Sequence, residues 1–117
     1  MKYALLIYND PAAFPADDAT DDAIMAEYAA VTQAMLDAGE LDRGERLARA
    51  DTATSVRVRG GKASVTDGPF AETKEQLGGY YLIEAQNLDD AVALAAQVPS
   101  ARFGSIEVRP LVGRDRP

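Results

Sequence analysis

Two short segments are apolar on both of their alternating faces, and they constrain the fold more than any other feature of the chain. Residues 2–8 carry Tyr3, Leu5 and Ile7 on one face and Ala4, Leu6 and Tyr8 on the other. Residues 79–85, Gly-Tyr-Tyr-Leu-Ile-Glu-Ala, are apolar on both faces over their middle. Side chains alternate across a sheet, so a strand covered on both faces has this pattern. We therefore expect both segments to be central strands of one sheet.

The other predicted strands are shorter and more polar. Residues 54–59 and 62–66 flank Gly60-Gly61. Because both glycines tolerate positive φ, we expect a two-residue β-hairpin there. Residues 41–47 have a weaker pattern, which we interpret as a short strand. A last strand is predicted over residues 105–109, ended by Pro110.

Two stretches have the spacing of amphipathic helices. The first has an apolar stripe whose residues are four, three and four positions apart: Ile24, Tyr28, Val31 and Met35. Thr20 is predicted as its N-cap and Gly39 as its C-cap. The second is predicted to begin after Asn87 as N-cap and to end before Pro99. Its predicted apolar face consists of Leu88, Val92, Ala95 and Ala96.

The order of these elements is β-α-β, then a β-hairpin, then β-α-β. It predicts an α+β fold, a ferredoxin-like split βαβ sandwich with an inserted β-hairpin, in which the two doubly apolar strands are central. Both helices would cover one face of the sheet, so the apolar residues of the other face would be exposed in a monomer. We therefore expect a homodimer whose open sheet faces pack together about a two-fold axis.

The size and charge of the chain limit its class and its partners. It has 117 residues, of which 47% are hydrophobic. We assign one domain to residues 1–112 and a short frayed tail to residues 113–117. The net charge of −7 argues against nucleic acid or an anionic membrane as a partner, because both bind basic surfaces.

The chain contains neither Cys nor His. Disulfides, thiolate chemistry and a structural zinc site are therefore excluded, and the acidic pairs near the first helix lack the spacing of a calcium loop. We expect no metal and no cofactor, so acid–base chemistry must use carboxylates, Lys or Tyr. The apolar start is too short to span a membrane and lacks a signal-peptide cleavage site, so a cytoplasmic location is predicted.

Residues 65–81 hold more reactive side chains than a scaffold requires. Asp67 opens the run Asp-Gly-Pro-Phe, which favours a turn. Two roles for Asp67 are compatible with this position. It fastens the turn by accepting backbone N–H groups, or it is a general base or ligand-orienting carboxylate at the mouth of a cleft.

The same stretch contains other candidate ligand contacts. Glu72 and Lys74 are either solvated residues of an exposed turn or site residues, with Lys74 meeting an anionic substrate group and Glu72 modulating it. Tyr8, Tyr80 and Tyr81 lie at or near the ends of the central strands and serve either packing or ligand contact. Because Tyr80 and Tyr81 are adjacent, one should meet the helices and the other the dimer cavity.

One long motif carries a resemblance to a known family. It comprises Asp67-Gly68-Pro69-Phe70, Ala71-Glu72-Thr73-Lys74-Glu75 and Gly78-Gly79-Tyr80. The chain resembles the YCII-related, or DGPF-domain, proteins. The resemblance extends to the start, Met1-Lys2-Tyr3, and to the end, Ser105-Ile106-Glu107-Val108-Arg109-Pro110, so it covers essentially the whole chain.

The resemblance implies a dimeric α/β-barrel, in which a ferredoxin-like sheet pairs with its copy. Most members have no known function, a few act on small aromatic ring compounds, and others are encoded beside extracytoplasmic-function sigma factors. A His–Asp pair has been suggested as catalytic in the YCII branch. This chain has no His, so only Asp67, at the motif aspartate, carries over.

Two functions are compatible with these observations. The first is a small-molecule-binding protein or a cofactor-free enzyme that uses a carboxylate as acid or base. Its pocket would lie between the sheet and the helices or in the dimer barrel, edged by Asp67, Lys74 and a tyrosine. The second is a non-catalytic regulatory or interaction module, associated with an extracytoplasmic-function sigma factor, whose acidic surface contacts a basic partner.

Overall fold

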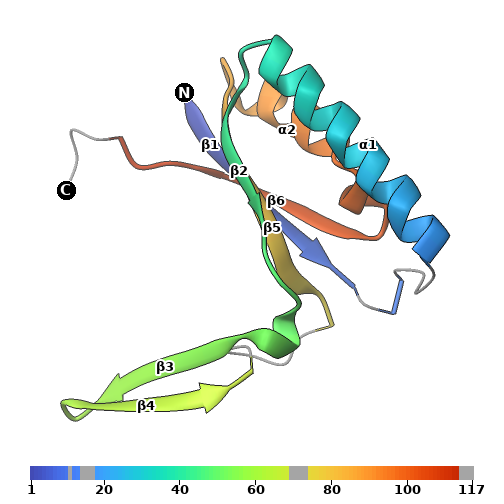
Figure 1. Ribbon diagram of the computed structural model, residues 1–117. Helices are drawn as coiled ribbons and strands as arrows, with labels where there is room; N and C mark the ends of the chain where they lie inside the picture. The colour runs from blue at the N-terminus through green and yellow to red at the C-terminus, as the bar shows by residue number, and fades with distance from the viewer. Residues whose placement is uncertain (11, 14–17, 69–73, 114–117) are drawn as a thin grey trace.

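The computed structural model describes residues 1–10, 12–13, 18–68 and 74–113. A four-stranded sheet has two helices on one of its faces, and a two-stranded hairpin extends away from it (Figure 1). The sheet consists of β1 (Lys2–Asn9), β2 (Leu41–Arg46), β5 (Gln76–Glu84) and β6 (Gly104–Pro110). The helices are α1 (Asp18–Asp37) and α2 (Leu88–Ala96), and the hairpin strands are β3 (Thr54–Arg59) and β4 (Lys62–Asp67). Two short 3₁₀ turns are η1 (Ala50–Thr52) and η2 (Pro99–Arg102).

The strand order of the sheet is β2-β5-β1-β6, and each neighbouring pair is antiparallel. The two strands that are apolar on both faces, β1 and β5, are central, as predicted. This is the strand order of the split βαβ arrangement, and the predicted α+β class is confirmed. The strand with the weakest apolar pattern, β2, lies at an edge, where fewer of its side chains need to be buried.

The core lies between the sheet and the two helices. Leu5 and Ile83 from the central strands and Met35 from α1 are fully buried, and Tyr28 and Val31 of α1 pack against them. The predicted stripe on α1 is therefore the face that covers the sheet. No helix in the described part of the chain combines the length and hydropathy needed to cross a membrane.

The end of α1 is a Schellman motif centred on Gly39, which has φ +72°. The Gly39 N–H donates to the Leu36 carbonyl at 3.1 Å, and the Glu40 N–H donates to the Met35 carbonyl at 2.9 Å. Glycine adopts this φ without strain, and the two bonds satisfy carbonyls of the last helical turn. The predicted C-cap is confirmed.

The predicted N-cap of α1 is wrong. The helix begins at Asp18, so Thr20 is already its third residue. Asp and Thr are both good N-caps. The sequence offers several of them in succession between residues 17 and 22, so residue preference alone does not select the first turn.

The N-cap of α2 is Asn87, as predicted. Its side-chain Oδ1 accepts a hydrogen bond from the Asp90 N–H at 2.9 Å. This bond satisfies one of the N–H groups that have no partner inside the helix.

The predicted apolar face of α2 is right at Ala95 and wrong at Leu88, Val92 and Ala96, which are exposed. Leu88 and Val92 are 52% and 49% exposed. Ala91 and Leu94 are buried beside Ala95. This short helix has apolar residues all round, and its small residue Ala91 is fully buried. A small residue at the contact lets the helix backbone approach the sheet closely, which a larger side chain would prevent.

The β3–β4 hairpin, which we call the arm, has the predicted strands and turn. Gly60 and Gly61 have φ +57° and +76°, as a two-residue hairpin requires. The arm is a separate sheet that projects from the rest of the fold (Figure 1). Three valines of one arm face are 59–66% exposed, and the register places Asp67 on that same face. These valines are Val56, Val58 and Val65.

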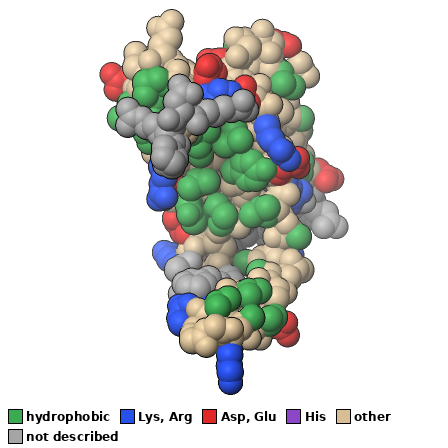
Figure 2. All heavy atoms as spheres, turned by 90° about the vertical axis from the view of Figure 1, so that its left-hand side faces the viewer, with side chains coloured by type: hydrophobic (Ala, Val, Ile, Leu, Met, Phe, Trp, Pro, Cys, Tyr) green, Lys and Arg blue, Asp and Glu red, His purple; other side chains and the backbone are tan. Residues whose placement is uncertain are grey.

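The sheet face opposite the helices, which we call the open face, carries apolar side chains across its central strands. Figure 2 views this side of the molecule and shows a hydrophobic patch above the arm. The register places Leu6 beside Tyr80, and Ala4 beside Leu82, on this face. Charged pairs of the edge strands flank them, namely Arg43 with Glu45 and Arg109 with Glu107.

Candidate functional site

A cleft of about 640 Å³ lies between α1 and the sheet. Its helix side is formed by Met25, Tyr28, Ala29, Thr32 and Gln33, and its sheet side comes mainly from β2 and β5. Three of the sheet residues that line it are glycines: Gly44, Gly78 and Gly79. A Cβ would lie under 3.0 Å from a backbone oxygen at Gly79 and from a side-chain atom at Gly44 and Gly78, so a side chain at any of the three would force a neighbour to move.

Two pairs of hydroxyl groups connect the walls of the cleft. Tyr81 Oη of β5 lies 2.8 Å from Thr32 Oγ1 of α1. Tyr28 Oη of α1 makes a short hydrogen bond with Oγ of Ser100, which is fully buried in η2. Each pair joins elements that are far apart in the sequence. The cleft is therefore apolar with polar points at fixed positions, which is typical of small-molecule sites.

The pKa of the Tyr28 phenol is raised above its ordinary value. Burial is the largest cause, and it outweighs the hydrogen bond with Ser100 and the positive charge of Arg46, which both lower the pKa. Tyr28 is thus a neutral phenol at neutral pH. It can donate a hydrogen bond to a ligand oxygen, and it is a poor general base.

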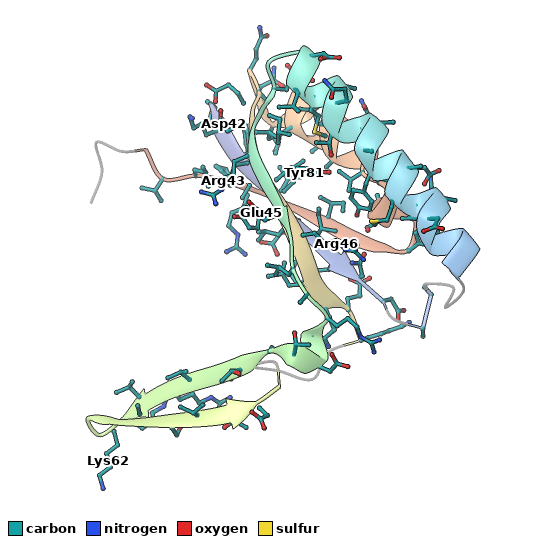
Figure 3. The ribbon with its side chains drawn as sticks, in the orientation of Figure 1. Asp42, Arg43, Glu45, Arg46, Lys62 and Tyr81 are labelled. Carbon is teal, nitrogen blue, oxygen red and sulfur yellow. The ribbon has the colours of Figure 1, made fainter. Side chains whose placement is uncertain are left out.

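Further polar residues line the cleft, namely Asn9, Gln33, Glu45 and Arg46. Arg46 ends β2 opposite Gly79, and its Nη1 donates to Sδ of Met25 at 3.1 Å. Asn9 Oδ1, at the end of β1, is inaccessible to solvent and has no hydrogen-bond partner among the described residues. Figure 3 shows Tyr81 and Arg46 on the helix side of the sheet, while Arg43 and Glu45 point away from the helices.

Tyr80 and Tyr81 face opposite sides of the sheet, as strand alternation predicts, and the dimer cavity expected for one of them stays a prediction. Tyr81 is buried on the helix side and belongs to the core. Tyr80 pairs with Leu6 and Glu45 on the open face and also borders the cleft. Tyr8 lies on the open face too, because it is two residues along β1 from Leu6.

Asp67 is exposed at the end of β4 and does not line the cleft. Its carboxylate makes no hydrogen bond to another described residue. The backbone beside it is held by other groups: the Gly68 N–H donates to the Ala53 carbonyl at 2.7 Å, and Ser55 Oγ donates to the Gly68 carbonyl at 2.8 Å. In the described residues, Gly68 and Ser55 therefore fasten the base of the arm.

Lys74 has a carboxylate partner inside the chain. Its Nζ lies 3.6 Å from Oδ2 of Asp10, whose side chain is only 12% exposed. Asp10 Oδ1 also accepts a hydrogen bond from the Ala12 N–H at 2.9 Å. Lys74 therefore neutralises a largely buried carboxylate at the end of β1. Glu72, the remaining predicted site residue, lies outside the described residues.

Tyr80 and Tyr81 are thus the predicted site residues that border the cleft, whereas Tyr8, Asp67 and Lys74 do not. Sequence reasoning missed Tyr28, Thr32, Ser100, Arg46 and Asn9 as cleft residues. The spacing of Tyr28 and Thr32, one helical turn apart on the core side of α1, is a signal that could have identified two of them. Ser100 carries no comparable signal.

Comparisons with known proteins identify the family. The family model for the YCII-related domain matches residues 1–113. An uncharacterized protein of Rhizobium meliloti (strain 1021) is 42% identical over 114 residues, which cover 95% of this chain and 92% of that protein.

A solved structure shares the fold at low sequence identity. It is 5-chloro-2-hydroxyhydroquinone dehydrochlorinase from Burkholderia phenoliruptrix AC1100, in complex with 2,5-dihydroxybenzoquinone. The TM-score is 0.59 and the identity 13%, over 98% of this chain and 97% of that one. The family match spans nearly the whole chain, and the chain therefore belongs to the YCII-related domain family.

Proposed function

We propose that this protein binds a small ring compound in the cleft between α1 and the sheet. The observation that carries the proposal is the cleft itself, whose volume of about 640 Å³ suits a small molecule. Its apolar walls would cover a ring, while the Tyr28 and Tyr81 hydroxyls would bond to oxygen substituents. The dehydrochlorinase of similar fold, which is named for a hydroxyhydroquinone, supports this ligand class by analogy.

If the protein is an enzyme, Asp67 is our candidate for the acid or base of a cofactor-free reaction. Its carboxylate is exposed and free of hydrogen bonds to other described residues, so it is available to a ligand. It does not line the cleft of its own chain. Its participation would therefore require the dimer barrel or the cleft of a second copy.

The ligand site can be tested by filling the cleft. Ala29 lines the cleft, whereas its exposed neighbour Ala30 does not. We expect Ala29→Phe to abolish binding of hydroquinone, measured by calorimetry, because its ring would occupy the ligand space. Ala30→Phe is the matched control and should bind like the unmodified protein. Equal binding by both variants, or no binding by the unmodified protein, would show that the cleft is not the site.

We also propose a homodimer formed through the open faces. Leu6, Tyr80 and Leu82 form an apolar row across the central strands, and their burial would provide the driving force. Two-fold packing of the two sheets would produce the α/β-barrel. Light scattering at micromolar concentration should give the mass of a dimer, and Leu82→Arg should give that of a monomer. A stable monomer of the unmodified protein would contradict the proposal.

A non-catalytic interaction module is the second candidate, and the arm is the observation that favours it. Its three exposed valines form the kind of apolar surface that marks protein contacts. An extracytoplasmic-function sigma factor is the expected partner. Recovery of a stoichiometric complex with that partner at high salt, together with an empty cleft in ligand titrations, would favour this function over ligand binding.

A further inference from the structure

Arg46 is a solvent-exposed cation that lines the rim of the ligand cleft. It ends β2, and its guanidinium reaches across to Met25 of α1, with Nη1 donating to Sδ at 3.1 Å. A thioether sulfur is a weak acceptor, and the guanidinium has five N–H donors. Most of the hydrogen-bonding capacity of Arg46 is therefore unused by Met25.

Glu45 lines the cleft, and its carboxylate pairs with Arg43 rather than with Arg46; Glu27 and Asp10, which do not line it, also pair with other cations. The pairs are Glu45 with Arg43 at 3.8 Å, Glu27 with Arg102 at 2.5 Å, and Asp10 with Lys74 at 3.6 Å. Within residues 1–10, 12–13, 18–68 and 74–113, no carboxylate forms an ion pair with Arg46. This is notable in a chain with a net charge of −7, which offers more carboxylates than cations.

The charge of Arg46 acts on the space that a ligand would occupy. Burial is the main influence on the pKa of Tyr28 and raises it, and the guanidinium of Arg46 opposes this by lowering it. Tyr28 and Arg46 both line the cleft, so the guanidinium and the phenol border the same space. Arginine keeps its positive charge at all ordinary pH values, and its planar fork matches the two oxygens of a carboxylate.

We infer that the ligand of the cleft is a ring compound bearing a carboxylate, and that Arg46 binds that carboxylate. This inference rests on the proposed ligand site and adds the charge of the ligand. The ring lies against the walls that Tyr28 and Tyr81 help to form, and the carboxylate takes up the unused donors of Arg46. Arg46 thus determines specificity for anionic over neutral rings.

A pair of ligands that differ in charge tests the inference. The probes are 2,5-dihydroxybenzoate and 2,5-dihydroxybenzamide, which have the same ring and similar shapes. Because hydrogen bonds to charged groups are stronger than neutral ones, the carboxylate should bind about tenfold more tightly at low ionic strength. The preference for the benzoate over the benzamide should decrease as salt is added, since Arg46 is exposed to solvent.

Two arginines of β2 give matched variants. Arg46→Gln should reduce the preference for the benzoate to about twofold or less while keeping the affinity for the benzamide, because a neutral side chain loses the charge-assisted bonds. Arg43→Gln makes the same change in net charge on the open face and should keep the full preference (Figure 3). Arg46→Lys should keep part of the preference for the benzoate, because lysine retains the positive charge. Circular dichroism checks that each variant is folded.

The outcomes separate this inference from the proposed function. Equal affinity of the unmodified protein for both rings would overturn the role of Arg46 while leaving the cleft as a ligand site. An equal loss of preference in Arg43→Gln and Arg46→Gln would also overturn it, because the effect would then come from net charge. Failure of both rings to bind would reject the ligand site and the inference together.

Discussion

Gly44 of β2 and Tyr81 of β5 are paired across neighbouring strands, and the Tyr81 ring lies where a side chain at Gly44 would project. A Cβ at Gly44 would collide with Cδ1 of the ring and lie 2.9 Å from Cε1. The ring in turn places its hydroxyl 2.8 Å from Thr32 Oγ1 of α1. A residue without a side chain in β2 thus sets the position of a phenol that joins the sheet to the helix.

Gly44→Ala should destabilise the protein. The added methyl group must displace the Tyr81 ring, and overpacking of this kind costs about 1–3 kcal/mol. Urea unfolding measures the change in free energy. Gly113→Ala is the control, because a Cβ there meets no atom within 4 Å, and its effect should stay within about 0.5 kcal/mol. Equal stabilities of the two variants would contradict the packing described for Gly44.

Tyr28 should ionise at higher pH than an ordinary tyrosine, because burial raises its pKa above 10.0. The folded state then holds this proton more tightly than the unfolded state. Its contribution to stability is complete below the unfolded pKa and is lost as pH rises from there through the folded pKa. The absorbance of tyrosinate during a pH titration should contain a component that ionises late and is absent in Tyr28→Phe. If the late component persists in Tyr28→Phe, it comes from another tyrosine and the prediction for Tyr28 is wrong.

Removal of the Asn87 side chain, the N-cap of α2, should lower the free energy of unfolding. Asn87→Ala deletes the acceptor of the Asp90 N–H, which should cost about 1 kcal/mol of unfolding free energy. Asn87→Asp retains an acceptor at the same position and should restore most of the stability. If thermal unfolding gave the same midpoint for Ala and Asp, the hydrogen bond would not be the source of the effect.

Asp67→Asn separates the two roles of this residue. Because the carboxylate is exposed and Gly68 and Ser55 hold the nearby backbone, stability should change by no more than about 0.5 kcal/mol. If Asp67 is the acid or base of a reaction, turnover of a ring ligand should fall by about a hundredfold or more. Unchanged binding and turnover in this variant would remove Asp67 from the site.

The predictions that succeeded depend on neighbours in the sequence. Residues 2–8 and 79–85 are predictable as central strands because side chains alternate between the two faces of a strand, so apolar residues on both faces indicate burial of both. The caps at Gly39 and Asn87 and the Gly60-Gly61 turn follow from local backbone preferences. Most of the predicted apolar face of α2 is wrong because contacts distant in the sequence decide it. An alanine-rich helix with apolar residues all round has no single preferred side, so its contact with the sheet decides which residues are buried.

The sequence by itself determined the element types, the central strands, the family motif and the exclusion of Cys and His chemistry. Only the tertiary structure brought Tyr28, Tyr81, Ser100 and Arg46 together, because these residues come from α1, β5, η2 and β2. Their contacts depend on how the helix lies across the sheet, and no local periodicity encodes that placement. The arm illustrates the same limit. Its strands alternate apolar and polar residues as a half-buried strand does, but the arm forms a separate sheet and its valines are exposed.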